Sequence, residues 1–262
     1  MRSRGLLCLL LFLLAVPCAG AQPRPGIVRP ANEGSLSPQE LGSQLFAANC
    51  ATCHGSTGQG IENAPPNRGA GNITGLGPSL VGVGARAADF YLRTGYMPLA
   101  HPGEQPRRSR VLFSGRELDA LIQYVASLGD GPSVPRPQPG EGNVARGLEL
   151  FTRHCAGCHQ VVAQGGFVTP AVAPPLADAT ATQIAEAVRI GPYVMPTFSE
   201  KQISDRELNA IIAYVEASKH PDDIGGWGIG HLGPVPEGIV TWLLAAVVLV
   251  ALCGVIGTRL RS

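Results

Sequence analysis

Two Cys-x-x-Cys-His pentads are the groups in this sequence whose residue types and spacing can do chemistry. They span Cys50–His54 and Cys155–His159. Two thiols three residues apart can reach the two vinyl groups of one haem, and the next histidine can bind its iron. Each pentad therefore predicts one covalently bound haem c. The expected thioether cysteines are Cys50, Cys53, Cys155 and Cys158, and the expected histidine ligands are His54 and His159.

Two other chemistries use a Cys-x-x-Cys pair, namely a redox dithiol and half of a zinc site. The histidine that follows each pair argues against both. Zinc would also need further cysteine or histidine ligands at short spacing. The remaining cysteines, Cys8, Cys18 and Cys253, lie in apolar segments instead.

The segments around the pentads are repeated, which indicates a tandem duplication. The Gly-x-x-Leu-Phe sequence at 42–46 matches 147–151, and Tyr96-Met97-Pro98 matches the Tyr-Val-Met-Pro sequence at 193–196. The difference in residue number between equivalent positions of the two copies decreases along the chain. The first copy is therefore the longer one, and we expect its insertions to lie in loops.

The chain has three methionines, which are the initiator, Met97 and Met195. A lone methionine is usually a core filler, but two at matched positions are better interpreted as axial iron ligands. Histidine and methionine together give a six-coordinate iron with a raised potential and no open site. This predicts electron transfer without bond-making chemistry. His101 could compete with Met97, although a solvated loop histidine is favoured because the second copy has no counterpart.

Pro78 and Pro174 each fall between pentad and methionine, where a proline carbonyl could accept the ring hydrogen of the ligating histidine. A simple turn proline is the equal alternative. Arg93 and Arg189 could meet haem carboxylates, though a solvated arginine at a helix end is the commoner outcome. The first copy's insertion carries a basic run that we expect to be solvated, with docking to an acidic partner as the alternative. This run contains Arg107, Arg108 and Arg110.

The elements that must position these residues are helices. A capping box at Ser37–Glu40 predicts a helix running into the first pentad, and Asn143 can cap its equivalent. Capping boxes at Ser114 and Ser204 begin the last helix of each copy, with apolar residues at helical spacing. Shorter helices are predicted over 85–94 and 181–190, each ended by a glycine. Each copy is thus expected to be an all-α domain around a haem.

The expected organisation divides the chain into six parts. A secretory signal covers 1–21, with two arginines, an apolar run and Ala19-Gly20-Ala21, although an uncleaved anchor stays open. The first cytochrome c domain covers 36–129, a Pro-rich extended linker 130–142, and the second domain 143–218. A Gly/Pro-rich linker at 219–237 leads to a membrane helix at 238–258, whose 21 uncharged residues match a bilayer core.

Composition and charge narrow the class further. Glycine and proline number 34 and 23, so loops must be abundant, and a haem could supply part of the apolar core. The net charge of +1 and the lack of a basic stripe interleaved with aromatic residues give no basis for nucleic-acid binding. Arg259 and Arg261 follow the membrane helix while Glu237 precedes it. The positive-inside rule therefore places the C-terminus in the cytoplasm and the haem domains on the other side of the cell membrane.

The whole chain resembles the di-haem cytochrome c subunit of actinobacterial-type cytochrome bc complexes. The resemblance rests on two tandem domains carrying Cys50–His54 and Cys155–His159, and on Gly233-Pro-Val-Pro-Glu-Gly238 leading into one C-terminal span. It implies two class I-type cytochrome c domains, two haem c groups and an electron-transfer role in a quinol:cytochrome c reductase. The implied partners are cytochrome b, a Rieske iron-sulfur protein as electron donor and a terminal cytochrome c oxidase as acceptor.

Three other functions stay open at this stage. An anchored cytochrome c could serve another oxidase or a dehydrogenase, but such subunits resemble proteins with an N-terminal anchor or a third haem. A di-haem peroxidase would need an open or displaceable iron ligand. A non-redox scaffold would not need both pentads.

Overall fold

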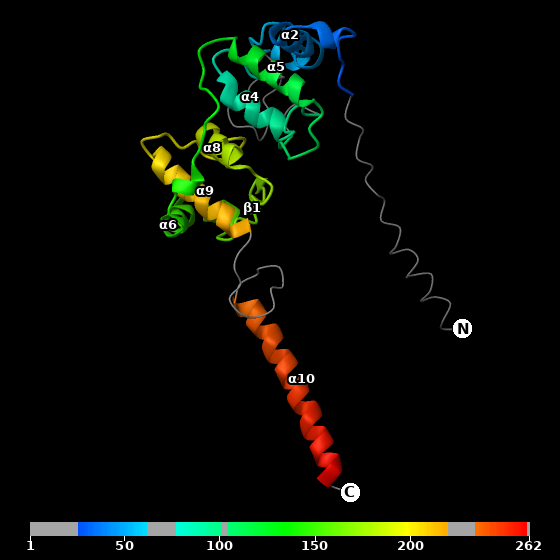
Figure 1. Cartoon of the computed structure of the whole chain (residues 1–262), viewed down its shortest axis with the longest axis vertical. Helices are drawn as coiled ribbons and strands as arrows, with labels where there is room; N and C mark the ends of the chain where they lie inside the picture. Colours follow the sequence, from blue (N-terminus) through cyan, green and yellow to red (C-terminus); the bar gives the residue numbers. More distant parts are fainter. Residues whose placement is uncertain (1–25, 62–76, 101–103, 220–233, 261–262) are drawn as a thin grey trace, which may run out of the picture.

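The computed structural model describes residues 26–61, 77–100, 104–219 and 234–260. Figure 1 shows two helical domains in series and a long separate helix at the C-terminal end. The first domain contains η1 (Glu33–Ser35), α2 (Pro38–Asn49), α3 (Ala51–His54), α4 (Gly84–Arg93) and α5 (Gly115–Ala126). The second contains η2 (Pro139–Glu141), α6 (Val144–His154), α7 (Ala156–His159), β1 (Gly166–Val168), β2 (Ala171–Ala173), α8 (Ala181–Ile190) and α9 (Asp205–Lys219). The last helix is α10 (Pro234–Leu260).

The predicted helix starts are confirmed by their hydrogen bonds. Ser37 and Ser114 each form a full capping box with the glutamate three residues later. Ser204 and Glu207 make the same reciprocal bonds, and the Asn143 side chain accepts from the Arg146 N–H. These bonds satisfy backbone donors that a helix start leaves free. Local sequence therefore sets where the main helices begin.

Each domain has its own apolar core, built around one pair of crossing helices. In the first domain α2 packs on α5, and in the second α6 packs on α9. Gly42 and Gly147 make these crossings close, because a Cβ at either glycine would collide with a backbone carbonyl of the partner helix. Next to each glycine a phenylalanine contacts a tyrosine, with ring centroids 5.0 Å apart in the first domain and 5.3 Å in the second. The two copies thus share the same helix packing as well as similar sequences.

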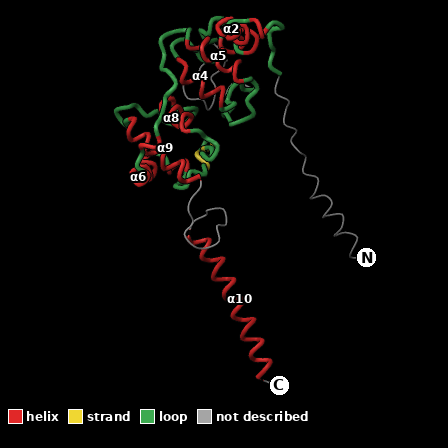
Figure 2. Tube along the Cα trace, viewed as in Figure 1, coloured by secondary structure: helices red, strands yellow, loops and turns green. Residues whose placement is uncertain are grey.

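The structure departs from a purely helical fold at one place. β1 and β2 form an antiparallel hairpin in which Phe167 pairs with Val172 (Figure 2). Phe167 of β1 is 94% exposed, whereas Ala171 of β2 is buried. Each strand has only three residues, which is too few for an alternating pattern to be recognised in the sequence.

The Pro-rich linker, which was predicted to be an extended connector, forms hydrogen bonds with both domains. At its start the Pro132 carbonyl accepts from the Arg86 N–H of α4. At its end the Gln138 N–H donates to the Asn209 side chain of α9, at 2.9 Å. The domains also touch directly, through α4 and α8. The two domains therefore share an interface, which we call the seam, formed by α4, the 104–110 segment, α8 and the β1–β2 hairpin.

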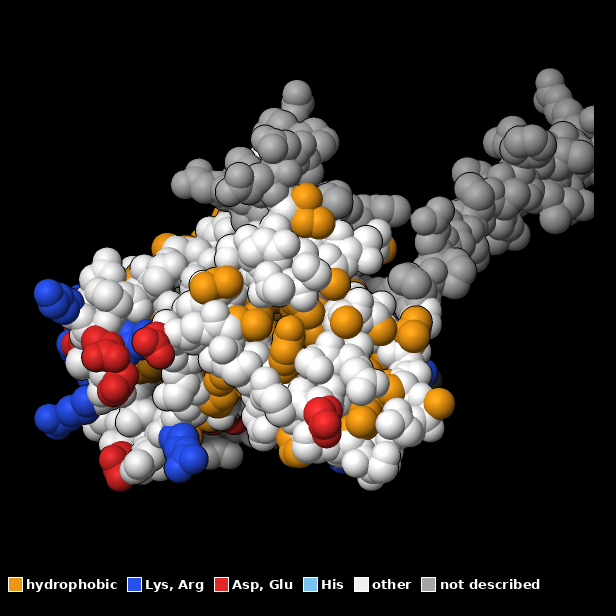
Figure 3. All heavy atoms as spheres, turned by 90° about the horizontal axis from the view of Figure 1, so that it is seen from above, with side chains coloured by type: hydrophobic (Ala, Val, Ile, Leu, Met, Phe, Trp, Pro, Cys, Tyr) orange, Lys and Arg blue, Asp and Glu red, His pale blue; other side chains and the backbone are white. Residues whose placement is uncertain are grey.

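α10 agrees with the predicted membrane helix. Its stretch Gly238–Leu260 is long and apolar enough to cross a bilayer, and it is not buried against the rest of the described chain. Viewed from above, the opposite end of the molecule has a mixed surface (Figure 3). Acidic and basic side chains lie together near one edge of that face, and hydrophobic side chains reach the surface across its middle.

Some predictions fall on parts of the chain outside the described residues. These are the signal at 1–21, His101, most of the linker at 219–237, and the tail residue Arg261. The first described residues nevertheless belong to the first domain. Arg29 forms an ion pair with the buried Glu117 at 2.6 Å, and Val28 exchanges backbone hydrogen bonds with the Asn49 side chain.

Candidate functional site

Both pentads are held as single helical turns at the ends of longer helices. Cys50 ends α2 and His54 ends α3, with the His54 N–H donating to the Cys50 carbonyl at 3.0 Å. The same bond joins His159 to Cys155 at 2.9 Å in the second domain. Residues four apart in a helical turn lie on the same side. The turn therefore presents a thiol and an imidazole to one space in each domain.

Each histidine ring is fixed by a proline carbonyl, as one of the two interpretations of Pro78 and Pro174 predicted. The His54 Nδ1 lies 2.8 Å from the Pro78 oxygen, and the His159 Nδ1 lies 3.0 Å from the Pro174 oxygen. A carbonyl can only accept, so Nδ1 must carry the proton. The lone pair of Nε2 is then left to bind a metal.

The loop after each pentad makes the same backbone bonds. The Gly60 N–H donates to the His54 carbonyl at 2.7 Å, and the Gly165 N–H donates to the His159 carbonyl at 3.0 Å. In the first domain Gly77 lies so close that a Cβ there would sit 2.7 Å from the Cys53 carbonyl oxygen. The proline loop is therefore pressed against the pentad.

The protonation of these groups fits haem attachment better than the alternatives. Burial lowers the pKa of His54 and His159, against the opposing effect of their proline hydrogen bonds, which favours the neutral imidazole that binds iron. Burial, with a smaller effect of the partner thiol, raises the pKa of Cys50 to about 12 and of Cys155 to about 11. A redox dithiol needs a lowered thiol pKa. Among the described residues no group of three or more His, Cys, Asp or Glu could hold a metal ion such as zinc.

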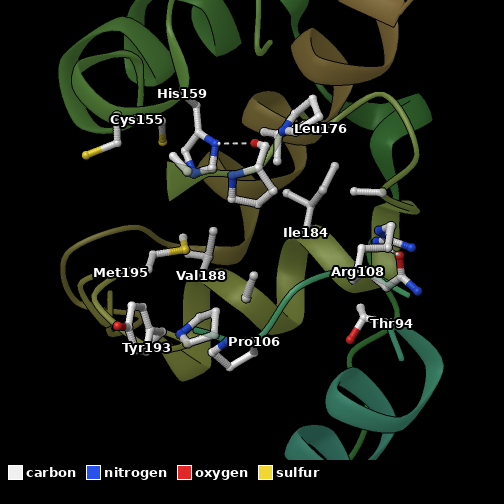
Figure 4. A pocket seen from close by; sticks show the side chains of 18 of the residues that line it. Thr94, Pro106, Arg108, Cys155, His159, Leu176, Ile184, Val188, Tyr193 and Met195 are labelled. Carbon is white, nitrogen blue, oxygen red and sulfur yellow. Dashed lines mark hydrogen bonds between the residues drawn. The ribbon is translucent and has the colours of Figure 1, made fainter. Parts of the chain in front are cut away.

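A cavity in the second domain joins the predicted ligands (Figure 4). Its empty volume is about 1090 Å³ with its open mouth included, and its lining contains Cys155, Cys158, His159 and Met195. His159 and Met195 lie on opposite sides of it, and the other lining residues are mostly apolar. Such a space suits a flat apolar cofactor with a central metal held between an imidazole nitrogen and a thioether sulfur.

The first domain completes the wall of this cavity, which the sequence did not predict. Thr94 and Tyr96 reach it from the end of α4, and Arg108 reaches it from the insertion of the first copy. Arg108 donates to the Gln183 side-chain oxygen of α8 at 2.7 Å, so it is not simply solvated. The only sequence signal was the position of this arginine in an insertion, and that does not reveal a contact with the other domain.

The first copy's methionine lies beside this shared wall. Met97 is half-buried in the loop after α4, where its N–H donates to the Tyr91 carbonyl at 3.1 Å. Its neighbour Tyr96 lines the second domain's cavity and packs edge-on against Phe90, with ring centroids 5.4 Å apart. Burial raises the pKa of Tyr91 to about 12. Phe90, Tyr91 and Tyr96 form an aromatic cluster next to Met97 in the sequence, and Phe90 and Tyr96 also line the second cavity.

The two arginines considered for haem carboxylates have other partners. Arg93 forms ion pairs with Asp89 and Asp119, at 2.7 and 2.6 Å. The side chain of Arg189 is 6% exposed and donates to the carbonyls of Phe198 and Ile203 and to Asp205. Both arginines therefore bind groups of the protein itself. The exposed His154 lies beside Phe198, with ring centroids 6.0 Å apart.

Comparison with known proteins agrees with this arrangement. The family model "Cytochrome c" matches residues 39–129, and "Cytochrome C oxidase, cbb3-type, subunit III" matches residues 142–215. A Corynebacterium diphtheriae protein named "Cytochrome bc1 complex cytochrome c subunit" is 34% identical over 94% of this chain and 92% of its own length. A Mycobacterium bovis protein of the same name is 35% identical over 98% and 91%. An Azospirillum "Cbb3-type cytochrome c oxidase subunit CcoP" is 28% identical over 66% and 60%.

Proposed function

Because the chain belongs to the family of cytochrome bc1 complex cytochrome c subunits, we propose that it is the membrane-anchored di-haem electron-transfer subunit of a quinol:cytochrome c reductase. It takes electrons from a Rieske iron-sulfur protein and delivers them to a terminal cytochrome c oxidase. Cytochrome b is its other partner in the membrane. Its cytochrome c domains imply covalently bound haem c, which supplies one-electron redox chemistry when bound.

The residues have separate tasks in this proposal. Cys50 and Cys53 attach the first haem, and Cys155 and Cys158 attach the second. His54 with Met97 would hold the iron of the first haem, and His159 with Met195 would hold the iron of the second. Pro78 and Pro174 hold the imidazoles in the tautomer that leaves Nε2 free.

One observation supports this function most strongly. His159, backed by the Pro174 carbonyl, faces Met195 across a cavity that also contains both cysteines of the pentad. With both residues as ligands, the iron of a bound haem would have no position left for oxygen or peroxide. The arrangement therefore favours an electron carrier over a peroxidase.

The anchor supports a fixed position in a membrane complex. α10 provides a candidate span, and Arg259 at its end, followed by Arg261, favours a cytoplasmic C-terminus. We propose that both haem domains lie on the extracytoplasmic side. An electron carrier tethered in this way would not need a separate soluble cytochrome.

Purification from native membranes tests the proposal. The tagged protein would be isolated in a gentle detergent, and its haems measured by a reduced-minus-oxidised pyridine haemochrome spectrum. We expect two c haems per chain, stoichiometric b-type haem and a co-purifying Rieske protein. Two c haems without b-type haem would overturn the reductase assignment.

That second outcome has its own support as an alternative function. The second domain matches a model of a cbb3-type oxidase subunit, and one relative carries the name of such a subunit. Co-purification of an oxidase alone would then assign the chain to an anchored cytochrome of that oxidase. The higher identity and coverage of the bc1 relatives favour the reductase.

A further inference from the structure

Among the described residues of the second domain, no lysine or arginine lines its cavity to balance haem carboxylates. Haem carries two carboxylates on the edge of the ring opposite to the vinyl groups that the cysteines bind. Buried or half-buried carboxylates need a charged or hydrogen-bonding partner. Arg189, the arginine of α8, is committed to two carbonyls and Asp205.

Arg108 of the first domain meets this need. Among the described residues that line the cavity, it is the one lysine or arginine. In Figure 4 it lies across the cavity from Cys155, which is the side where the carboxylate edge of an attached haem would lie. Its charge reaches the cavity wall, since it opposes the effect of burial on the pKa of Tyr96.

The insertion that carries Arg108 is fixed to the second domain by a neighbouring residue. The Gln105 side chain donates to the Val172 carbonyl at 2.7 Å and accepts from the Val172 N–H at 3.1 Å. This pair of bonds extends the edge of β2 as another strand would. The Gln183 oxygen, 2.7 Å from an Arg108 nitrogen, then orients the guanidinium. A guanidinium has five N–H donors, so others stay available for a carboxylate.

From these contacts we propose that Arg108, supplied by the first domain, binds a carboxylate of the haem held by the second domain. The proposal rests on the proposed di-haem function and adds a positioning residue to it. One domain thereby provides the countercharge for the cofactor of the other. Correct docking of the domains then sets the potential of the second haem.

The physical effect of Arg108 has a definite sign. A cation beside the haem disfavours the more positive ferric state and so raises the potential. It also favours the ionised carboxylate, which keeps the carboxylate pKa low. Replacing Arg108 should therefore lower the potential of one haem. It should also make that potential fall with rising pH near neutrality, because the carboxylate would then titrate there.

The test compares Arg108→Gln, Arg108→Lys and Arg107→Gln in the full-length protein. Arg107 is the matched control, because it is exposed on the same segment and does not line the cavity. Potentiometric titrations at several pH values would follow both haems. In Arg108→Gln the ratio of reduced to oxidised haem at a fixed ambient potential should fall several-fold for one haem, where tenfold equals about 59 mV. Arg108→Lys should restore most of this ratio, and Arg107→Gln should leave it unchanged.

Haem content keeps the two proposals distinguishable. A wild-type protein without two c haems would contradict the proposed function itself. Two haems in every variant, with the same potentials and pH dependence in Arg108→Gln as in Arg107→Gln, would overturn only the role of Arg108. A role limited to holding the domains through Gln183 would likewise leave the pH dependence of the potential unmoved.

Discussion

At the residue scale, the hydrogen bond from each pentad histidine decides which ring nitrogen is left for iron. The His54 and His159 rings are both backed by a proline carbonyl, at 2.8 and 3.0 Å. Such a bond fixes the ring orientation and raises the basicity of the free nitrogen. Both copies have this bond, although the segments between histidine and proline differ in length.

The axial methionines give the first prediction. Met195→His should lower the potential of the second haem by a sizeable part of the roughly 0.8 V that axial ligands span, because imidazole replaces thioether. It should also remove one of two sulfur-to-iron bands in the near-infrared spectrum. Met97→His should do the same for the first haem. Survival of both bands in either variant would show that the methionine assignment is wrong.

At the element scale, each domain depends on one close helix crossing. Gly42 allows α2 to approach α5, and Gly147 allows α6 to approach α9. The helix before each pentad is thereby fixed against the last helix of its domain. The pentad follows directly on that helix, so its position depends on the crossing.

The crossing gives the second prediction. Gly147→Ala should destabilise the second domain by about 1–3 kcal/mol, because the new Cβ meets the Ala210 carbonyl and the Tyr214 side chain. Gly140→Ala is the control, since no atom lies within 4 Å of a Cβ there. Hydrogen exchange measured by mass spectrometry would locate the loss of protection. Equal loss of protection at α2 and α5 would contradict a separate second core.

At the scale of the whole molecule, the seam between the domains contains a fully buried glutamate, Glu186. Glu186 of α8 is 0% exposed, and neither of its carboxylate oxygens has a hydrogen-bond partner among the described residues. Asp89, Arg86 and Arg93 of α4 are the charged groups that act on it from the other domain. Burial, together with the charge of Asp89, raises the pKa of Glu186 to about 8 despite the two arginines. The protonated form of this acid is therefore favoured at neutral pH.

This acid gives the third prediction. Its folded-state pKa lies above the unfolded value of 4.5, so the folded state binds more protons between pH about 4.5 and 8. Stability should therefore fall as pH rises through this window, by a few kcal/mol at most. Glu186→Gln should flatten the dependence and raise the melting temperature at pH 8, whereas the exposed Glu141→Gln should not. Parallel melting curves for wild type and Glu186→Gln across the window would refute the prediction.

The sequence by itself determined the features that depend on neighbouring residues. The pentads, the capping boxes at Ser37 and Ser114, and the helix ended by Gly191 follow from groups a few positions apart. The span in α10 follows from a long uncharged run. Resemblance over the whole chain then indicated the family, which the relatives confirm.

The contacts between the two domains were decided only by the tertiary structure. It brought Arg108 and Gln105 of the first copy to the second cavity, and it turned Arg93 and Arg189 away from the role considered for them. It also buried Glu186 in the seam. These contacts join residues that are far apart in the chain, and they depend on the complementary surfaces of two folded domains. A local pattern of residue types does not predict which surfaces will meet.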